Sequence, residues 1–377
     1  MSQQERRPCE PRLRRRRPHR KSRQGCSECK ARHIKCDERR PSCANCVISE
    51  RPCSYPVHDP PDSAPITRNV IRTAGNIAPE VSEVSDCFNA IHLACLHHAE
   101  TQMEKYMALS ESAQPIIELA IACTDTAPFL LDQVLALSAL HLSTEVNTKK
   151  EAYHRQATYL QNRALQLFNQ SKVEVSDSNR LPMFLFGSLL GIHVLKETLA
   201  GHSGTISAFI EKFIHYLHLH RGIRAFICDQ SWNQILQSDL KSLLYLSRLS
   251  QRMEDQAPGA ETIKLRTLFD SYNARDDVII ACQSALQWIQ WMLDVCKQDP
   301  SEELIGIHAI LAWPIVIPEE YIDALWKHRP EAFAVLVFYA AALQRHQRFW
   351  VFGDSGTSLL SLLSSSIGSF WLGHLDL

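Results

Sequence analysis

The stretch that decides the fold reads Cys26-Ser-Glu-Cys29-Lys-Ala-Arg-His-Ile-Lys-Cys36-Asp-Glu-Arg-Arg-Pro-Ser-Cys43-Ala-Asn-Cys46-Val-Ile-Ser-Glu-Arg-Pro-Cys53. Its spacing is C-x2-C-x6-C written twice, with six residues between the two halves. At the overall cysteine frequency, such a series would arise by chance with a probability on the order of 10⁻⁷ per starting residue. The spacing therefore has a physical cause, which is either disulfide bonding or metal binding.

The choice between disulfides and metal depends on the redox compartment. The first 25 residues are rich in arginine and proline and contain no apolar signal-peptide core, so we expect a reducing environment that disfavours disulfides. Thiolates favour tetrahedral zinc. Six thiolates cannot fill two separate four-sulfur sites, so two sulfurs must each bind two metals. The cysteines predict a cluster of two zinc ions in which one sulfur from each half is shared, and zinc would stabilise this short segment.

The net charge of −1 conceals a basic head and an acidic body. Residues 1–55 hold 16 Lys and Arg against 6 Asp and Glu, whereas residues 56–377 hold 24 against 35. This asymmetry indicates a polyanion-binding segment joined to a second part of the chain with a different role. Within the head, the run Arg14, Arg15, Arg16 and Arg17 favours nuclear import together with contacts to nucleic-acid phosphates. A merely solubilising tail is the alternative for this run.

The composition divides the chain into four parts. Ten of the 18 prolines fall in the first 80 residues, and few large apolar residues lie between positions 57 and 85. We expect a disordered basic arm at residues 1–24, the cysteine domain at 25–56, a flexible linker at 57–85 and an all-α domain at 86–377.

The all-α prediction for the fourth part rests on apolar residues at spacings of three and four, without a long alternating run. Pro115 and Pro128 suit the first turns of two of the expected helices. The expected helical stretches are Phe88–Met107, Pro115–Cys123, Phe129–Leu142, Tyr153–Phe168, Met183–Leu199, Thr205–His220, Trp232–Arg252, Asp276–Cys296, Pro318–His328 and Glu331–Phe349.

The sequence lacks the motifs and segments that are typical of several functional classes. Glycine is scarce, and the sequence contains no GxGxxG, GxxxxGK[ST], HExxH or GxSxG motif, so we expect no enzyme. The apolar runs Met183–Leu195 and Ala332–Leu343 fall short of the roughly 18–20 residues that cross a bilayer, so we expect no membrane protein. His97, His98, His215, His218 and His220 are interpreted as helix or interface residues. The scattered thiols are interpreted as buried and reduced: Cys87, Cys95, Cys123, Cys228, Cys282 and Cys296.

The cysteine segment resembles the fungal Zn2Cys6 binuclear-cluster transcription factors. The resemblance covers Gly25–Pro56 and includes Lys30, Lys35-Cys36-Asp37, Pro41 and Tyr55. It implies two short helices, one following each CxxC pair. It also implies that Cys26 and Cys43 bridge the two zinc ions, that Cys29 and Cys36 complete one site, and that Cys46 and Cys53 complete the other.

The same resemblance implies how DNA would be read. In the family, side chains near the end of the first helix enter the major groove, typically at a CGG triplet, and the matching positions are Arg32 and His33. Many members have lysine where His33 stands, which leaves the base preference open. Arginine and lysine read guanine well, so Arg32 is the better candidate for direct readout, with Lys30 and Lys35 as neighbouring DNA contacts.

Residues 86–377 are similar to the regulatory domains of sterol-uptake regulators and of regulators of biosynthetic gene clusters. The similar runs are "CLHHAET…APFLLDQVLALSALHL…YHRQATYLQNRALQLF" and "WPIVIPEEYIDAL…RPEAFAVLVFYAAALQRHQRFW". The resemblance implies an all-α regulatory domain that holds a small apolar, sterol-like ligand. It implies a nuclear regulator of RNA polymerase II genes of metabolic, sterol-related or secondary-metabolite function.

Three questions stay open at this point. Residues 57–85 show no sustained heptads, so the protein binds DNA either as a homodimer formed by its helical domain or as a monomer. The cluster could instead be a zinc-dependent module that binds proteins. The helical domain could also be chiefly a small-molecule carrier, with DNA binding incidental.

Overall fold

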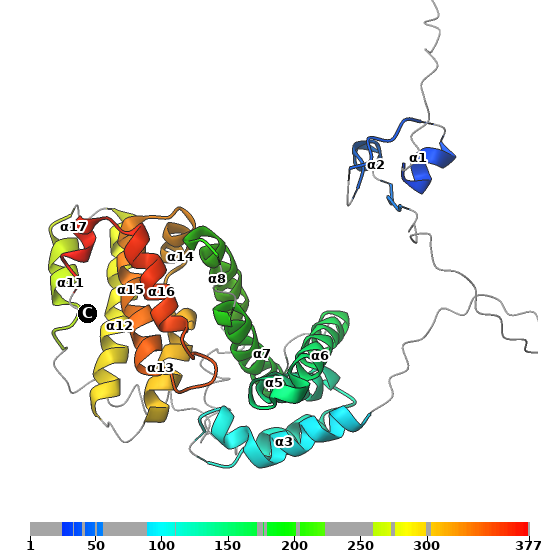
Figure 1. Cartoon of the computed structure of the whole chain (residues 1–377), viewed down its shortest axis with the longest axis horizontal. Coiled ribbons are helices and arrows are strands. Elements are labelled where there is room, and N and C mark those ends of the chain that lie inside the picture. The colour runs from blue at the N-terminus through cyan, green and yellow to red at the C-terminus, as the bar shows by residue number, and fades with distance from the viewer. Residues whose placement is uncertain are drawn as a thin grey trace, which may run out of the picture. The chain divides into compact units, whose positions relative to one another are not determined.

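A computed structural model describes residues 25–32, 34–39, 42–49, 51–55, 89–109, 111–171, 176, 179–200, 204–222, 259–272, 276–298 and 303–375. The chain divides into two compact units, Met1–Glu83 and Val84–Leu377, and each is described by itself. The predicted arm at 1–24, the linker at 57–85, His33 and the helix expected at Trp232–Arg252 lie outside the described residues. Every regular element within those described ranges is a helix (Figure 1).

The first unit contains the two short helices that the resemblance implies, α1 (Ser27–Ala31) and α2 (Ala44–Ile48). Cys26 and Cys43 are their N-caps, so each helix contains the second cysteine of its CxxC pair. The sulfur of Cys26 accepts a hydrogen bond from the backbone N–H of Cys29. At α2 the N–H of Ala44 donates to the carboxylate of Asp37, at 3.1 Å from Oδ1, where a negative charge is favourable at a helix N-terminus.

The second unit, in its described part, is a set of packed helices. In chain order these are α3 (Ala90–Tyr106), α4 (Gln114–Ala122), α5 (Pro128–Glu145), the 3-10 turn η1 (Asn147–Lys149), α6 (Lys150–Ser171), α7 (Arg180–Ala200), α8 (Ile206–Arg221), α11 (Ile263–Asp270), α12 (Asp277–Gln298), α13 (Glu303–Val316), α14 (Glu319–Trp326), α15 (Pro330–Arg345), α16 (Ser355–Ser366) and α17 (Ser369–Leu372).

Helix starts in this unit follow from local chemistry. Pro115 and Pro128 stand in the first turns of α4 and α5, as predicted, where the missing proline N–H costs no hydrogen bond. Asn89 caps α3 by accepting hydrogen bonds from the N–H groups of Ile91 and His92. Thr205 caps α8 in the same way.

Two helices form the centres of the core. Helix α5 is buried along most of its length and packs against α3, α4, α6 and α7. Helix α15, which holds the apolar run Ala332–Leu343, packs against α12, α13, α14, α16 and α17. Helix α8 contacts α7 on one side and α13, α14 and α16 on the other, so it joins the two groups (Figure 1).

The structure corrects several details of the sequence analysis. Helices α11, α13, α16 and α17 were not expected, and α13 continues past Pro314 to Val316. Helix α15 ends at Arg345 rather than at Phe349. We expected no segment long and apolar enough to cross a bilayer, and this is wrong for α7, whose 21 residues are sufficient by length and composition. Two pairs of helices that meet at a bend would also be sufficient if each pair formed one span, which gives up to three candidate spans among the described residues. Within the unit, most of α7 is buried, and the helix packs against α5 and α8.

Candidate metal centre and nucleic-acid interface

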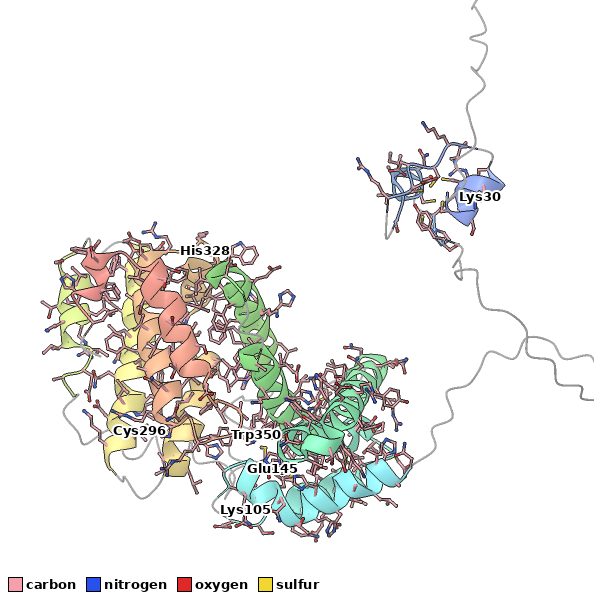
Figure 2. All side chains as sticks on the ribbon, in the orientation of Figure 1. Lys30, Lys105, Glu145, Cys296, His328 and Trp350 are labelled. Carbon is pink, nitrogen blue, oxygen red and sulfur yellow. The ribbon has the colours of Figure 1, made fainter. Side chains whose placement is uncertain are left out.

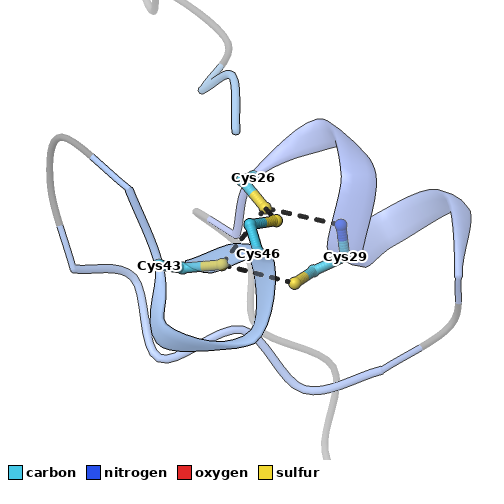
Figure 3. Close-up of side chains that lie close together, drawn as sticks. All are labelled: Cys26, Cys29, Cys43 and Cys46. Atoms are coloured by element: carbon cyan, nitrogen blue, oxygen red, sulfur yellow. Dashed lines mark hydrogen bonds between the residues drawn. The ribbon is translucent and has the colours of Figure 1, made fainter. Parts of the chain in front are cut away.

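Five of the six spaced cysteines are buried in the first unit, and Cys53 is half-buried. The sulfur atoms of Cys26, Cys29, Cys43 and Cys46 all lie within 4.8 Å of one another. Figure 3 shows these four side chains converging from α1 and α2 on a common centre. The sulfur of Cys26 is 3.7 Å from those of Cys43 and Cys46, and the sulfur of Cys29 is 3.6 Å from that of Cys43.

These separations fit tetrahedral zinc and do not fit disulfides. A disulfide brings two sulfurs to about 2.05 Å, and all six cysteines are free. Zinc bonded to sulfur at about 2.3 Å in a tetrahedron implies ligand sulfurs about 3.8 Å apart. The observed 3.6 to 3.7 Å is close to that edge. The sulfurs are therefore spaced as thiolates around shared metal ions, and bound zinc would supply the positive charge that six converging thiolates need.

The contacts between sulfurs centre on Cys26 and Cys43. Cys26 contacts Cys43 and Cys46, and Cys43 also contacts Cys29. The backbone N–H groups of Cys26 and Cys43 also lie against the sulfurs of Cys36 and Cys53, at 3.5 and 3.3 Å. Cys26 and Cys43 therefore each touch ligands from both halves of the repeat.

Two opposing influences act on the thiols of this centre. Burial raises the pKa of Cys29 to about 12. For Cys36, burial also disfavours the thiolate, but N–H donors from Cys26 and Glu38 outweigh it and lower the pKa. The N–H of Cys43, 3.3 Å from the sulfur of Cys53, lowers the pKa of that thiol. N–H donors to sulfur stabilise thiolates, which is the form that binds metal.

Contacts at the periphery hold the ends of the cluster segment together. The N–H of Ser27 donates to the carbonyl oxygen of Ser54 at 2.8 Å. Arg51 forms an ion pair with Glu28, with 3.0 Å between Nη1 and Oε1. The hydroxyl of Tyr55 donates to the carbonyl oxygen of Arg39 at 2.7 Å. The segment 26–55 is thereby closed around the sulfurs, which gather between α1 and α2 (Figure 2).

The described basic residues lie on the outside of this unit. Lys30 is in the last turn of α1 and Arg32 is its C-cap, and both are exposed, as is Lys35 (Figure 2 labels Lys30). Arg32 Nη1 donates to the hydroxyl oxygen of Ser49 at 3.1 Å. Of the expected DNA contacts, Lys30, Arg32 and Lys35 are described by the structure, and they share one short segment. The others, Arg14–Arg17 and His33, are outside the described residues.

Sequence reasoning missed the polar residues that support this segment. Asn45 and Ser49, both associated with α2, hydrogen-bond to the segment 32–35. Asp37 appeared in the family resemblance, but its capping of α2 was not foreseen. Nothing in the cysteine spacing identifies Asn45 or Ser49, because their partners are distant in sequence.

Among the described residues, no comparable group of three potential metal ligands lies in the helical unit. The rings of His98 and His141 share a hydrogen bond at 2.8 Å, and burial lowers the pKa of His141 to about 4. His218 pairs with Glu319 at 3.3 Å. Each of these histidines lies on a helix, His98 on α3, His141 on α5 and His218 on α8. Of the scattered thiols, Cys95, Cys123 and Cys282 are free and buried and Cys296 is half-buried, whereas Cys87 and Cys228 lie outside the described residues.

Comparison with known proteins agrees with the geometry. Residues 24–61 match the family described as "Fungal Zn(2)-Cys(6) binuclear cluster domain". A "Zn(2)-C6 fungal-type transcription factor" of Gibberella zeae is 22% identical over 428 residues, covering 96% of this chain and 85% of the relative. The cluster match and the full-length similarity thus point to one class of protein.

Two further relatives match over shorter stretches. "Sterol uptake control protein 2" of Candida albicans is 45% identical over 60 residues, which are 16% of this chain and 7% of that protein. The "Zn(2)-C6 fungal-type transcription factor afumD" of Aspergillus fumigatus is 32% identical over 130 residues, which are 33% of this chain and 34% of the relative. The likeness to the sterol uptake protein is therefore confined to a short segment. Residues 24–61 are a fungal Zn(2)-Cys(6) binuclear cluster domain, which binds two zinc ions, and the chain as a whole is similar to DNA-binding transcription regulators that carry this domain.

Proposed function

We propose that the chain is a sequence-specific regulator in which Cys26 and Cys43 bridge the two zinc ions. Cys29 and Cys36 would complete one site, and Cys46 and Cys53 the other. The observation that carries this assignment is that the sulfurs of Cys26 and Cys43 contact each other, while Cys26 also contacts Cys46 and Cys43 also contacts Cys29. Two tetrahedra that share one edge bring each bridging sulfur close to ligands of both sites.

DNA readout is assigned to the exposed residues at and after the end of α1. Arg32 can present two N–H donors to guanine O6 and N7, which is the commonest base-specific contact in the major groove. Lys30, Lys35 and His33 would lie beside it, and a CGG-type triplet is the proposed core. The exposure of Arg32 and Lys35 on one short segment supports this assignment.

The run Arg14, Arg15, Arg16 and Arg17 would bind phosphates without regard to sequence and direct the protein to the nucleus. Its support is the charge asymmetry, since residues 1–55 carry 16 Lys and Arg against 6 Asp and Glu. Phosphate contacts strengthen binding to all DNA, whereas base contacts select the site. The arm and the cluster therefore have separable effects.

Selection of binding sites from random duplex DNA by the zinc-loaded full chain tests this function. We expect enrichment of CGG-like triplets. Two triplets at a fixed spacing would support a homodimer, and a single triplet would support a monomer. If no sequence is enriched, DNA reading is refuted and a zinc-dependent protein-interaction module becomes the better explanation.

The helical unit is proposed to sense a small, largely apolar ligand, with sterol-related or secondary-metabolite genes as its targets. The supporting observation is that several buried polar atoms, on α5, α8 and α15, have no hydrogen-bond partner among the described residues: both amide atoms of Gln133 and the hydroxyls of Tyr216 and Tyr339. Buried polar groups in proteins are almost always paired. A ligand carrying a hydroxyl or carbonyl group would satisfy such atoms.

Native mass spectrometry and lipid extraction of the purified full chain test ligand binding. We expect a bound small molecule of mostly apolar character, lost or weakened in Tyr216→Phe and retained in Tyr321→Phe, whose hydroxyl is already bonded to the carbonyl of Ala332 at 3.0 Å. A ligand-free wild type that also binds no added sterol would refute this part and leave the DNA assignment intact.

A further inference from the structure

A row of hydrogen bonds links the DNA-facing segment to α2. Arg32 Nη1 donates to the hydroxyl oxygen of Ser49 at 3.1 Å. The hydroxyl of Ser49 donates in turn to the carbonyl oxygen of Asn45. Asn45 Nδ2 donates to the carbonyl oxygen of Lys35 at 2.7 Å. Two side chains from the second half of the cysteine repeat therefore hold the side chain of one basic residue and the backbone of another.

Zinc coordination does not account for these contacts. None of the four residues supplies a sulfur, and the bonds run between the two halves on the outside of the cluster. An exposed arginine ordinarily samples many rotamers, and Arg32 is exposed. Its guanidinium is nevertheless fixed to a residue 17 positions away. The same helix is also tied to this segment at its start, where Asp37 accepts from the N–H of Ala44.

We propose that Asn45 and Ser49, here termed the α2 clamp, are positioning residues that hold Arg32 and Lys35 ready for base readout. The proposal rests on the DNA-reading function assigned above. A guanidinium has five N–H donors, and the bond to Ser49 uses one on Nη1. The donors on Nε and Nη2 have no partner among the described residues of the unit, and they can form a bidentate pair with a guanine. An arginine ordered before binding loses less side-chain freedom when the complex forms.

The test uses the zinc-loaded full chain and the best duplex recovered by selection, with a permuted duplex of the same composition. In Ser49→Ala the ratio of the two affinities should fall about three- to tenfold, the range expected for ordering one long side chain. Affinity for the permuted duplex and the zinc content should not change. Ser49→Thr keeps the hydroxyl and should retain the ratio, and Ser42→Ala removes an exposed serine of the same unit as a matched control. An unchanged ratio, or an equal loss on both duplexes, overturns the clamp.

Two further measurements separate the clamp from the DNA-reading assignment. If Arg32→Ala leaves the affinity ratio intact, base readout by Arg32 is wrong; if Arg32→Ala abolishes the ratio and Ser49→Ala does not alter it, only the clamp is wrong. In the Arg32→Ala background, Ser49→Ala should cause no further loss, and a further loss would mean a merely structural role. Without DNA, the ¹⁵N heteronuclear NOE of the Arg32 Nε–H should drop in Ser49→Ala and stay high in Ser42→Ala. An equal NOE in wild type and Ser49→Ala contradicts the clamp directly.

Discussion

The sulfur atoms of Cys26 and Cys43 lie 3.7 Å apart, although the two residues are 17 positions apart in the sequence and each caps a different helix. Cys26 begins the first half of the repeat and Cys43 begins the second. The two helices are thus joined through their capping residues rather than through an apolar interface. In so small a unit, the sulfur centre takes the place of a hydrophobic core.

Replacing a bridging cysteine should cost more zinc than replacing a terminal one. In Cys43→Ala both metals lose a ligand, so the zinc content of the dialysed chain should fall to about zero and the unit should unfold. In Cys53→Ala one complete four-sulfur site survives, and about one zinc ion per chain should remain. Elemental analysis checks both values. Cys123→Ala removes a buried thiol of the helical unit and should keep both ions. Equal zinc loss in Cys43→Ala and Cys53→Ala would contradict the bridging assignment.

Neutralising the arginine run should weaken binding to every DNA sequence by a similar factor. With Arg14, Arg15, Arg16 and Arg17 replaced by glutamine, the slope of log affinity against log salt should flatten by about 0.9 for each phosphate that the arm no longer neutralises. Fluorescence anisotropy between about 50 and 200 mM salt measures the slope. Glutamine at the exposed Lys149 and Lys150 of the helical unit is the control and should leave it unchanged. A slope that does not respond to the arginine substitutions refutes the phosphate role of the arm.

The cysteine unit was predictable because the intervals between its cysteines along the chain restrict how the thiols can be bonded. Once metal is chosen over disulfides, six thiols at these intervals predict a cluster of two zinc ions, and the two short helices are what the resemblance to the zinc-cluster family implies. Helix α5 was predictable for a local reason, since Pro128 marks its first turn and an apolar face follows. In each case the signal lies in one continuous stretch of the sequence.

The elements that were missed depend on tertiary contacts. Helix α13 is apolar nearly all round and contains Pro314, so it lacks the periodicity that identifies a surface helix. Helix α16 reads Ser355–Ser366 and is rich in serine; its packing against α15 outweighs the modest propensity of its residues. Asn45 and Ser49 gain their roles only when the two halves of the repeat fold together. Local sequence carries none of this information.

The buried hydroxyl of Tyr339 should reduce the stability of the ligand-free helical unit. It has no partner among the described residues, and its ring is stacked on that of Trp313 at 4.6 Å. Tyr339→Phe keeps the ring and removes the unpaired group, so the free energy of unfolding should rise by about 1 kcal/mol. Tyr321→Phe, which breaks a bond to Ala332, should lower it by about 1 kcal/mol. Urea unfolding of the lipid-stripped chain measures both, and a loss of stability in Tyr339→Phe would contradict the unpaired hydroxyl.

The stability of the helical unit should fall between pH 7 and pH 5, in part because of His220. Complete burial lowers the pKa of His220 from 6.5 to about 4, so the folded state keeps this ring neutral where the unfolded chain takes up a proton. The contribution of His220 to the free energy of unfolding is fully present above pH 6.5 and is lost as the pH falls towards 4. In His220→Gln the loss on going from pH 7 to 5 should be smaller by about 1–2 kcal/mol. All seven tryptophans lie in this unit, so their fluorescence follows its unfolding, and an identical pH dependence in both proteins would exclude a buried neutral His220.

Gly356 should be the least replaceable glycine of the C-terminal helices. A Cβ at this position of α16 would lie 2.6 Å from Cα of Gln344 and 2.7 Å from the carbonyl oxygen of Ala340, and both are backbone atoms of α15. The two helices would have to separate, since no side-chain rotation relieves the overlap. Gly356→Ala should lower the free energy of unfolding by about 1–3 kcal/mol, despite the better helix propensity of alanine. At Gly368 a Cβ would meet nothing within 4 Å, so Gly368→Ala should change stability by less than about 0.5 kcal/mol. Equal denaturation midpoints for the two variants would mean that α15 and α16 do not pack this closely in solution.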